Sequence, residues 1–420
     1  MIEIKPKKIE SAEVTLPGSK SFTHRMMITA ALSNGHCILS NWLKSEDTLH
    51  TLETLKRFGI QTEPAEPDLH IHGQSGFIGP YAHPIYLGNS GTSMRLISAL
   101  AALGNGIYHL TGNQRMQERP IQDLIDGLEQ IGVCAKTLNS DGCPPLTIAG
   151  GKLTGGQIEL NCEKSSQFLS ALLLIGPYSV NGIDIFVTRG PVSRPYIDMT
   201  IEVMEKFGVE VKRDGYKRFA VDGNQQYLAG DFNVEPDASQ ASYFWGAAAI
   251  TGAEIKVRGL TKESKQGDMG FVELLERMGC HVSHESNGIR VKGGTLSAID
   301  VDMSSMPDVV PTLAVVAAFS EGTTHIKNVG HLREKETDRL GAVVSELSKM
   351  GIEAWSTDSD LIVKGGRPEG SLIDTYDDHR IAMSFSIAGL RIPGMNISDE
   401  KCVEKSFPKF WDVLESLPSV

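Results

Sequence analysis

The chain has 420 residues, of which 40% are hydrophobic and 22% are charged, and its formal net charge is −12. This composition is typical of a globular protein rather than a disordered chain, and the length suggests two or three domains of about 150 residues. The acidic balance disfavours a protein that grips nucleic acid, because such proteins are basic over their binding surface.

The first residues of the chain, 1–6, show neither an apolar signal segment nor an Arg- and Ser-rich presequence. The longest apolar runs, 96–103 and 313–319, fall short of the ~18 residues that a membrane helix needs. Both are therefore expected to be core helices, and we expect a cytoplasmic protein with no membrane partner.

Six segments share a pattern in which a strand runs into a polar loop and then into the start of a helix. They recur about every 72 residues. The segments are 16–25 (LPGSKSFTHR), 86–95 (YLGNSGTSMR), 160–169 (LNCEKSSQFL), 234–243 (VEPDASQASY), 301–310 (VDMSSMPDVV) and 375–384 (TYDDHRIAMS).

A second pattern alternates with the first: an amphipathic helix ends at a glycine and a short β-rich run follows. The five copies are 52–63, 124–136, 201–212, 272–284 and 343–355, with their glycines at 59, 132, 208, 279 and 351. Glycine at this position supplies the left-handed residue that ends a helix. Each repeat has room for two helices and three or four strands.

Six such repeats fit two domains of three better than one array, because a single core stops growing at about 250–300 residues. The midpoint of the series falls near residue 230, beside the polar, glycine-containing stretch 223–231. The sequence therefore predicts an α/β protein of two three-repeat domains.

Basic residues gather in and near the polar loops although the chain is acidic overall. They are Lys20, Arg25, Arg95, Lys164 and Arg380 in the loops, and Arg119, Lys335, Arg339 and Lys405 close by. Helix N-termini favour anions, and guanidinium groups match phosphate and carboxylate. We interpret the loops as a site for a small anionic molecule, although ordinary helix capping also uses Ser, Thr and Asp.

Two acidic residues near these loops allow two interpretations each. Lys335 and Arg339 would share one face of a helix and could hold an anion, but Glu336 and Arg339 could equally form a surface ion pair. Asp308 follows Pro307 at the start of an apolar helix, where it is either a residue that the helix dipole favours or a catalytic base.

The six cysteines, at 37, 134, 143, 162, 280 and 402, form no C-x-x-C pair, and the 12 histidines form no H-x-x-x-H pattern. The sequence therefore predicts free thiols and no metal site.

Nine motifs, read together, resemble the 5-enolpyruvylshikimate-3-phosphate synthases, a family of enolpyruvyl transferases. They span residues 14 to about 411 in the order that the family has. The motifs are PGSKSFTHR (17–25), LGNSGTSMRL (87–96), QERPI (117–121), SSQFLSALLL (165–174), SRPYIDMT (193–200), PDVVPTLA (307–314), KETDRL (335–340), DDHRIAM (377–383) and EKSFPKFW (404–411).

The resemblance implies a two-domain inside-out α/β barrel of six βαβαββ repeats, with the active site in the interdomain cleft. It assigns residues 18–230 to the N-terminal domain. Residues 1–17 and 231–420 would form the C-terminal domain, which includes the N-terminal strand.

The family transfers the enolpyruvyl group of phosphoenolpyruvate to the 5-hydroxyl of shikimate 3-phosphate and releases phosphate, through a tetrahedral ketal. This transferase step belongs to the shikimate pathway, which leads through chorismate to the aromatic amino acids, and it is the target of glyphosate. The resemblance implies these two small molecules as the only partners, no metal or organic cofactor, and a monomer.

The resemblance also assigns site residues. The phosphoenolpyruvate side would use Lys20, Gly91, Arg119, Arg339, Arg380 and Lys405. The shikimate 3-phosphate side would use Lys20, Ser21, Arg25, Ser165, Ser166, Gln167, Ser193, Tyr196, Asp308 and Lys335. Asp308 would take the proton of the 5-hydroxyl, and Glu336, alone or with Lys20, would protonate the methylene carbon; the division of these proton transfers stays open.

The sequence departs from the family at two places. His331 stands where the family often has Asn, so one shikimate-phosphate contact is unassigned. Leu96, Ser90 and Ser93 stand where glyphosate-sensitive members have Pro, Ala and Ala, while Gly91 is retained. The response to glyphosate is therefore not predicted.

Three alternatives compete with this interpretation. UDP-N-acetylglucosamine enolpyruvyl transferase shares the fold, but it usually has Cys where Gln114 stands and Lys-Asn where Lys20 and Ser21 stand. A pseudo-symmetric DNA clamp would need basic residues along a ring face rather than in helix-start loops. A repeat scaffold without chemistry would not require Lys335, Glu336 and Arg339 within one turn.

Overall fold

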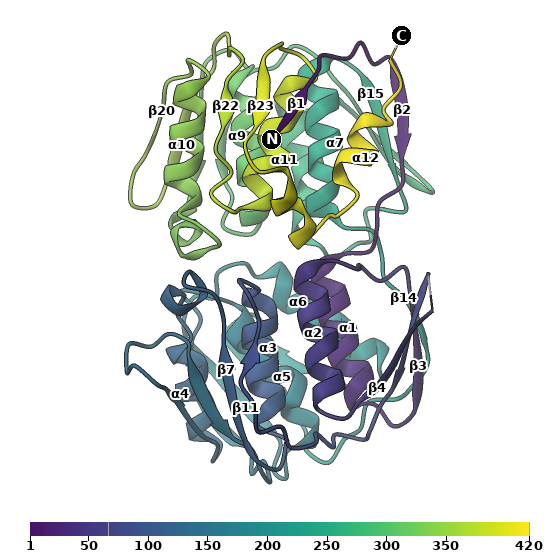
Figure 1. Ribbon diagram of the computed structural model, residues 1–420, viewed down its shortest axis with the longest axis vertical. Coiled ribbons are helices and arrows are strands. Elements are labelled where there is room, and N and C mark those ends of the chain that lie inside the picture. The colour runs from purple at the N-terminus through teal and green to yellow at the C-terminus, as the bar shows by residue number, and fades with distance from the viewer. Residues whose placement is uncertain (66, 420) are drawn as a thin grey trace. The chain divides into compact units, whose positions relative to one another are not determined.

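The computed structural model describes residues 1–65 and 67–419, and the chain divides into two compact units. Unit 2 is Gly18–Glu235, and unit 1 combines Met1–Pro17 with the chain from Pro236 onward. In Figure 1 the N-terminal strands β1 and β2 (purple) accordingly lie in the same unit as the C-terminal part of the chain, which is coloured from teal through green to yellow.

Unit 2 has three four-stranded sheets, each with one parallel pair and two antiparallel pairs. The first sheet has the spatial order β14 (Asp231–Asn233), β3 (His36–Ser40), β5 (Asp68–His72) and β4 (Gln61–Ala65). The second has the order β6 (Ile85–Tyr86), β7 (Ile107–Thr111), β9 (Leu146–Ala149) and β8 (Cys134–Thr137). The third has the order β10 (Gly156–Asn161), β11 (Ile183–Arg189), β13 (Arg218–Val221) and β12 (Lys212–Asp214). The helices are α1 (Lys20–Leu32), α2 (Glu46–Arg57), α3 (Gly91–Ala101), α4 (Gln122–Gln130), α5 (Gln167–Ile175) and α6 (Pro195–Lys206), with the 3-10 turns η1 (Met116–Glu118) and η2 (Gly176–Tyr178).

Unit 1 has two sheets of this plan and a third sheet of three strands, with one antiparallel and one parallel pair. Its sheets are β2 (Ser11–Val14), β15 (Glu254–Arg258), β17 (Gly288–Lys292) and β16 (His281–Glu285); β18 (Asp300–Asp302), β19 (Thr323–Lys327), β21 (Leu361–Lys364) and β20 (Ala354–Ser356); and β1 (Ile2–Ile4), β23 (Met395–Ile397) and β22 (Leu372–Ile373). Its helices are α7 (Ala238–Thr251), α8 (Phe271–Arg277), α9 (Val310–Ala318), α10 (Arg339–Lys349), α11 (His379–Gly389) and α12 (Phe410–Glu415), with the 3-10 turns η3 (Gly267–Gly270), η4 (Pro307–Val309), η5 (Gly330–Glu334) and η6 (Glu400–Lys405).

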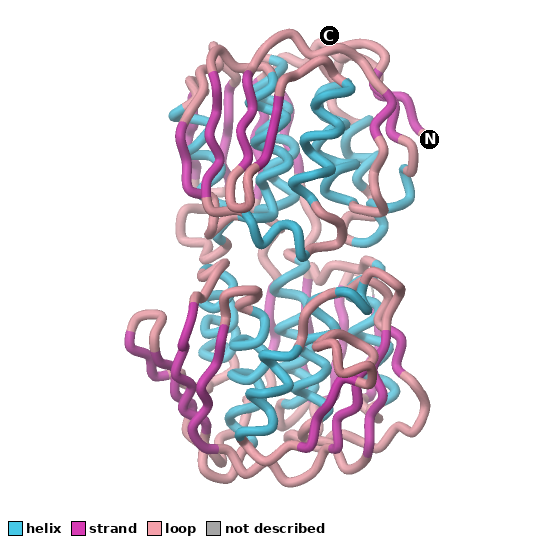
Figure 2. Tube along the Cα trace, turned by 90° about the vertical axis from the view of Figure 1, so that its left-hand side faces the viewer, coloured by secondary structure: helices cyan, strands magenta, loops and turns pink. Residues whose placement is uncertain are grey.

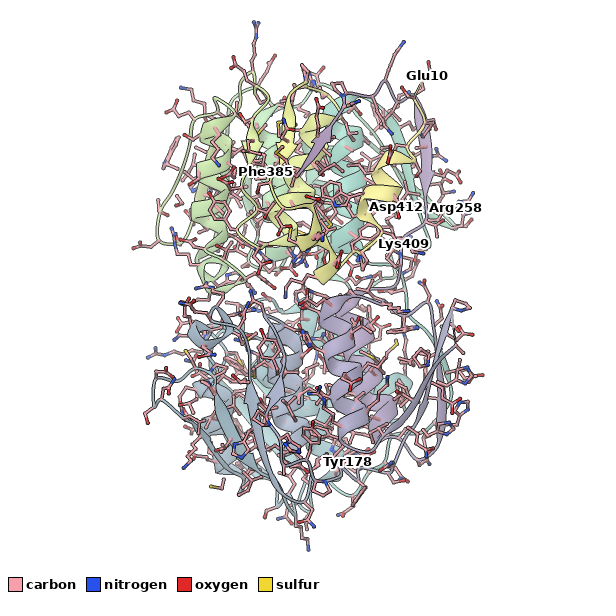
Figure 3. The ribbon with its side chains drawn as sticks, in the orientation of Figure 1. Glu10, Tyr178, Arg258, Phe385, Lys409 and Asp412 are labelled. Carbon is pink, nitrogen blue, oxygen red and sulfur yellow. The ribbon has the colours of Figure 1, made fainter. Side chains whose placement is uncertain are left out.

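The helices of each unit lie inside its sheets, as Figure 2 shows with the helices in cyan and the strands in magenta. Every residue of α3, α9 and α11 is buried. A helix that lacks a continuous polar face is stable when other elements cover it on all sides, as in a core. In Figure 3 Phe385 of α11 accordingly lies among the helices of unit 1, whereas Arg258 at the end of β15 lies at the surface.

The repeat that the resemblance implies has the order strand, helix, strand, helix, strand, strand. It appears without interruption as β6-α3-β7-α4-β8-β9 and as β10-α5-β11-α6-β12-β13. The five helix-ending glycines have positive φ, from +75° at Gly351 to +109° at Gly279, which confirms their predicted role.

The chain passes between the two units twice. Each time, the first strand of a repeat stays in the unit that the chain leaves, and the helix that follows belongs to the other unit. β14 pairs in parallel with β3 of unit 2 immediately before the chain enters α7 of unit 1, while β2 pairs in parallel with β15 of unit 1 immediately before α1 of unit 2. The second crossing therefore follows Glu235 rather than lying near residue 230, because β14 remains in a sheet of unit 2.

Two further properties follow from the described residues. All six cysteines are free, as predicted. No helix in the described part of the chain is both long enough and apolar enough to span a bilayer.

Candidate active site

Each of the six polar loops leads into a helix or a 3-10 turn. Ser90, Asp237 and Asp378 cap α3, α7 and α11 by accepting a backbone N–H with their side chains. Helices α1 and α5 and the turn η4 start without a side-chain cap bond in the described structure. Capping by the residue before the helix therefore accounts for three of the loops, and the polar side chains of the other three make the contacts described below.

Arg25 is a guanidinium buried in unit 2 among neutral acceptors. Its Nε donates to Thr200 Oγ1 (2.7 Å), and its terminal nitrogens donate to the backbone oxygens of Ser21 (2.9 Å) and Tyr196 (3.1 Å). Within the described residues no carboxylate pairs with it, and burial lowers its pKa to about 10. A buried cation without an acidic partner favours an anionic ligand.

The start of α5 and the loop before α6 contribute the predicted hydroxyls and amide. Ser165 Oγ accepts from the backbone N–H of Gln167 (3.2 Å), and Gln167 Nε2 donates to Thr92 Oγ1 on α3 (3.1 Å). Ser166 is buried at the start of α5. Ser193, with φ +53°, is buried, and its hydroxyl has no hydrogen-bond partner among the described residues. An unsatisfied buried hydroxyl is a candidate ligand contact.

Lys20 is buried at the first residue of α1, where its Nζ donates to Asp47 Oδ2 on α2 at 3.1 Å. The side chains of Lys20 and Asp47 are only 11% and 3% exposed. The carboxylate therefore holds the ammonium at the start of α1, where the helix also favours an anion.

Gly91 is the first residue of α3 and lies against two guanidinium groups. A Cβ at this position would stand 2.5 Å from Arg119 Nη2 and 2.6 Å from Arg95 Nη1. Arg119 is held by the backbone oxygen (3.0 Å) and Oδ1 (3.1 Å) of Asn89. Two cations at a helix N-terminus, with backbone N–H groups exposed by the glycine, form an arrangement suited to a phosphate or a carboxylate.

Arg339 is the centre of the charged cluster in unit 1. Its guanidinium donates to Asp378 Oδ2 (2.8 Å), Glu336 Oε2 (2.8 Å) and Asp308 Oδ1 (3.0 Å), and its side chain is 1% exposed. Burial alone would lower the pKa of Arg339, but the charges of these carboxylates hold that pKa above its ordinary value.

Asp308 bridges two guanidinium groups. Besides its bond to Arg339, its Oδ2 accepts from Arg380 Nη2 at 2.7 Å. Arg380 also contacts the hydroxyl of Tyr243 (3.5 Å), whose pKa burial raises. The carboxylate is thus oriented at both of its oxygens.

Asp268 on η3 is a buried carboxyl near this cluster. Ser239 donates a hydrogen bond to its Oδ2, while its Oδ1 has no partner among the described residues. Burial raises the pKa of Asp268 to about 7, and the charge of Asp308 adds to the shift.

The prediction that Lys335 and Arg339 share a helix face is wrong. Lys335 is extended after η5, and α10 begins only at Arg339, because Asp338 caps it by accepting from Gly341 N at 3.1 Å. Glu336 nevertheless reaches Arg339, so the alternative ion pair does form, but with a side chain only 9% exposed. Asp308 likewise lies on η4 rather than on α9 itself.

The other predicted residues of unit 1 lie on short turns. Lys405 is buried at the end of η6, which packs against α11. His331 on η5 is a neutral imidazole: burial and the positive charge of Lys335 lower its pKa to about 3. Its Nε2 is buried without a hydrogen-bond partner in the described structure.

Sequence reasoning missed the residues that hold the predicted ones in place. Asp47 accepts a hydrogen bond from Lys20, and Asn89 accepts from Arg119. Thr200 accepts from Arg25, and Asp378 accepts from Arg339. Two of them, Asn89 and Asp378, lie in the six polar loops, and Thr200 ends the motif at 193–200, whereas Asp47 lies in none of the motifs. The pairings themselves carry no local signal, because the partners are distant in the chain. The described residues contain no group of three or more His, Cys, Asp or Glu side chains that could hold a metal ion.

The sequence matches the family model of EPSP synthase (3-phosphoshikimate 1-carboxyvinyltransferase) over residues 4–414. The chain belongs to the EPSP synthase family. It is 41% identical over 411 residues to the 3-phosphoshikimate 1-carboxyvinyltransferase of Syntrophobacter fumaroxidans, covering 97% of each chain. It is 43% identical over 411 residues to that of Vibrio campbellii, covering 96% of each.

The fold is also that of an EPSP synthase. An EPSP synthase structure from Acinetobacter baumannii superposes with a TM-score of 0.84 and 29% identity, covering 99% of this chain and 97% of the other. These comparisons confirm the predicted resemblance, the α/β fold and an enzyme of this transferase class. They favour shikimate 3-phosphate over the sugar nucleotide of the alternative enzyme.

Proposed function

We propose that the chain transfers the enolpyruvyl group of phosphoenolpyruvate to the 5-hydroxyl of shikimate 3-phosphate with the side chains described above. The observation that carries this assignment is Asp308, an acceptor held between Arg339 and Arg380 in a chain of the EPSP synthase family. Two guanidinium groups around one carboxylate can stabilise the charge that develops on an anionic substrate.

Phosphoenolpyruvate carries a phosphate and a carboxylate, so its contacts are assigned to cations. In unit 2 these are Lys20 and Arg119, with Gly91 leaving room for the substrate at the start of α3. In unit 1 they are Arg339, Arg380 and Lys405. A substrate anion would partly replace the carboxylates that now neutralise Arg339 and Arg380.

Shikimate 3-phosphate is assigned to the hydroxyls and the remaining cations. Support comes from Arg25, which lacks an acidic partner, and from Ser193, whose hydroxyl is unsatisfied among the described residues. The full assignment is Lys20, Ser21, Arg25, Ser165, Ser166, Gln167, Ser193, Tyr196, Asp308 and Lys335. We add His331, because its neutral imidazole offers the buried Nε2 for a hydrogen bond that an Asn side chain could also make.

The reaction needs two proton transfers before phosphate leaves. Asp308 takes the proton of the 5-hydroxyl while the hydroxyl oxygen bonds to C2 of phosphoenolpyruvate. Glu336, alone or with Lys20, gives a proton to C3. The tetrahedral ketal then loses a proton from C3 while the C2–O bond to phosphate breaks. Arg339 stabilises the charge that develops during these proton transfers, since its guanidinium contacts both Asp308 and Glu336.

The test is phosphate release from phosphoenolpyruvate with each acceptor in turn. Release with shikimate 3-phosphate, and not with UDP-N-acetylglucosamine, is expected. Asp308→Asn keeps the shape of the side chain and one acceptor oxygen but removes the base, and we expect kcat to fall by at least about 100-fold. Lys364→Gln, a substitution in an exposed ion pair of unit 1, is the control and should leave kcat unchanged. Release only with the sugar nucleotide would contradict the proposal.

We also propose a cytoplasmic enzyme that acts as a monomer. The six free cysteines support the reducing compartment. Light scattering on the purified chain, with and without substrates, tests the oligomeric state.

A further inference from the structure

A chain of buried hydroxyl groups connects three helices of unit 2 at the start of α3. Ser93 Oγ lies 2.7 Å from Ser90 Oγ and 2.9 Å from Thr51 Oγ1 on α2. Thr51 Oγ1 in turn lies 2.8 Å from His24 Nδ1 on α1. All four side chains have no exposed surface. Polar groups buried so completely strengthen one another when hydrogen bonds connect them, whereas an unpaired one is costly.

Ser93 is the junction between this network and Lys20. Its hydroxyl donates to the backbone oxygen of Asp47 at 3.1 Å, and the carboxylate of the same Asp47 holds the ammonium of Lys20 at 3.1 Å. A hydroxyl has a single proton, so a Ser93 that donates to Asp47 must accept from Thr51 and Ser90. The bonds then run in one direction, from His24 through Thr51 and Ser93 to Asp47.

The network borders two residues that the proposed function assigns to phosphoenolpyruvate, Lys20 and Gly91. Ser90 and Ser93 flank the first residues of α3, which begins at Gly91. Asp47 determines where the Lys20 ammonium lies. A displacement of α2 relative to α3 would therefore change the distance between the cation and the anion-binding helix start.

We propose that Ser93 and Thr51 are positioning residues that fix the Lys20 ammonium relative to Gly91, and thereby set the affinity for the enolpyruvyl donor. Neither side chain has to touch the substrate, because each acts through Asp47 and the start of α3. This inference rests on the proposed function, since it takes Lys20 and Gly91 as parts of the phosphoenolpyruvate site.

The chain offers matched controls on the same two helices. Ser98 on α3 is as buried as Ser93, but its hydroxyl donates only to the backbone of its own helix, at Met94 O (2.6 Å). Thr54 on α2 does the same to His50 O (2.8 Å). Ser98→Ala and Thr54→Val therefore delete the same atoms at the same burial without touching the network.

The experiment measures steady-state constants for both substrates in Ser93→Ala, Thr51→Val, the double variant and the two controls. We expect KM for phosphoenolpyruvate to rise at least about threefold in Ser93→Ala and Thr51→Val, because the first removes the hydrogen bond from Ser93 to Asp47 and the second removes the bonds that Thr51 makes with Ser93 and His24. The KM for shikimate 3-phosphate should change less, because the site assigned to that substrate includes Lys20 but not Gly91. The double variant should resemble a single one rather than show the product of both effects. Thr51→Ser, which keeps the hydroxyl, should restore the wild-type KM.

Three results would overturn the inference: a KM for phosphoenolpyruvate that stays at the wild-type value, equal changes for both substrates, or equal effects of the controls. Thermal unfolding of every variant separates these results from a loss of folding, since a purely structural role would lower Tm in all of them alike. If the wild-type chain released no phosphate with shikimate 3-phosphate, the proposed function would fail first, independently of the network.

Discussion

At the scale of single residues, Gly91 shows how the backbone of α3 shapes the donor site. A methyl group there would lie 2.5 Å from Arg119 Nη2 and 2.6 Å from Arg95 Nη1, closer than atoms can approach. The helix itself would accept alanine, which is a better helix former than glycine. The collision, rather than the backbone, therefore decides the effect of the substitution.

We predict that Gly91→Ala displaces Arg119 and raises KM for phosphoenolpyruvate by about tenfold or more, since displacements near 1 Å at a positioned group have large effects. The KM for shikimate 3-phosphate should change little, and Tm should stay near the wild-type value. Initial rates at varied concentrations of each substrate check this. A loss shared equally between the two substrates would show that Gly91 does not belong to the donor side.

His331 supports a second prediction, on the pH dependence of stability. Its pKa is about 3 in the folded chain, whereas an unfolded histidine titrates near 6.5. Between these values the unfolded chain binds the extra proton, so the wild type loses stability as the pH falls from about 6.5 towards 3. His331→Asn removes this proton uptake.

The expected advantage of the Asn variant over the wild type is up to about 2 kcal/mol larger at pH 5 than at pH 8. Urea unfolding at the two pH values measures it. In the same variant the KM for shikimate 3-phosphate should stay within about threefold of the wild type, because the amide replaces the Nε2 hydrogen bond, while His331→Ala should lose that contact. An identical pH response in both proteins would place the imidazole in contact with water.

At the scale of elements, the periodic features were predictable from the sequence and the long-range pairings were not. The helix starts and the glycine stops are local signals, and the structure confirms them at Gly59 and Gly351. The exchange of β2 and β14 depends on pairing with strands distant in the chain, which no local pattern encodes. The prediction that Lys335 lies on the same helix as Arg339 was wrong because Asp338 caps α10, so the helix begins at Arg339 and does not reach Lys335.

The same contrast applies to the candidate site. The residues that would face a substrate stand in loops with recognisable composition, such as Lys20 and Arg380. The residues that hold them, such as Asp47, come from other repeats or other elements and look like ordinary helix residues in the sequence. Asp268 was missed for a related reason, since only its burial distinguishes it from a surface Asp.

The helix-stop glycines allow a prediction at this scale. Gly59 has φ +86°, and no neighbouring atom lies within 4 Å of the position that a methyl group would take, so conformation alone opposes a side chain there. We predict that Gly59→Ala lowers the free energy of unfolding by roughly 1 kcal/mol, and Gly59→Asn by less. Gly151 has equal space but no positive φ, so Gly151→Ala should be neutral or slightly stabilising. Urea unfolding compares the three variants; equal losses at both glycines would contradict the conformational explanation.

At the scale of the whole molecule, the chain forms two hydrophobic cores that share no residue. One core contains side chains of unit 1 alone, including Leu313 of α9, and the other contains side chains of unit 2 alone, including Leu173 of α5. Regions of a protein that share few buried contacts open as separate cooperative units. The two connections of the chain and the exchanged strands β2 and β14 are the features that could oppose this independence.

We therefore predict that Leu173→Ala destabilises unit 2 by about 2–5 kcal/mol and leaves the stability of unit 1 nearly unchanged. Amide hydrogen exchange should then accelerate in the core helices α3 and α5, while α9 and α11 keep their protection. Leu313→Ala should produce the opposite pattern, and each variant is the control for the other. If either substitution accelerated exchange in both sets of helices, the crossings would couple the two cores into one folding unit, because a strand released from one sheet would also release the helix that follows it.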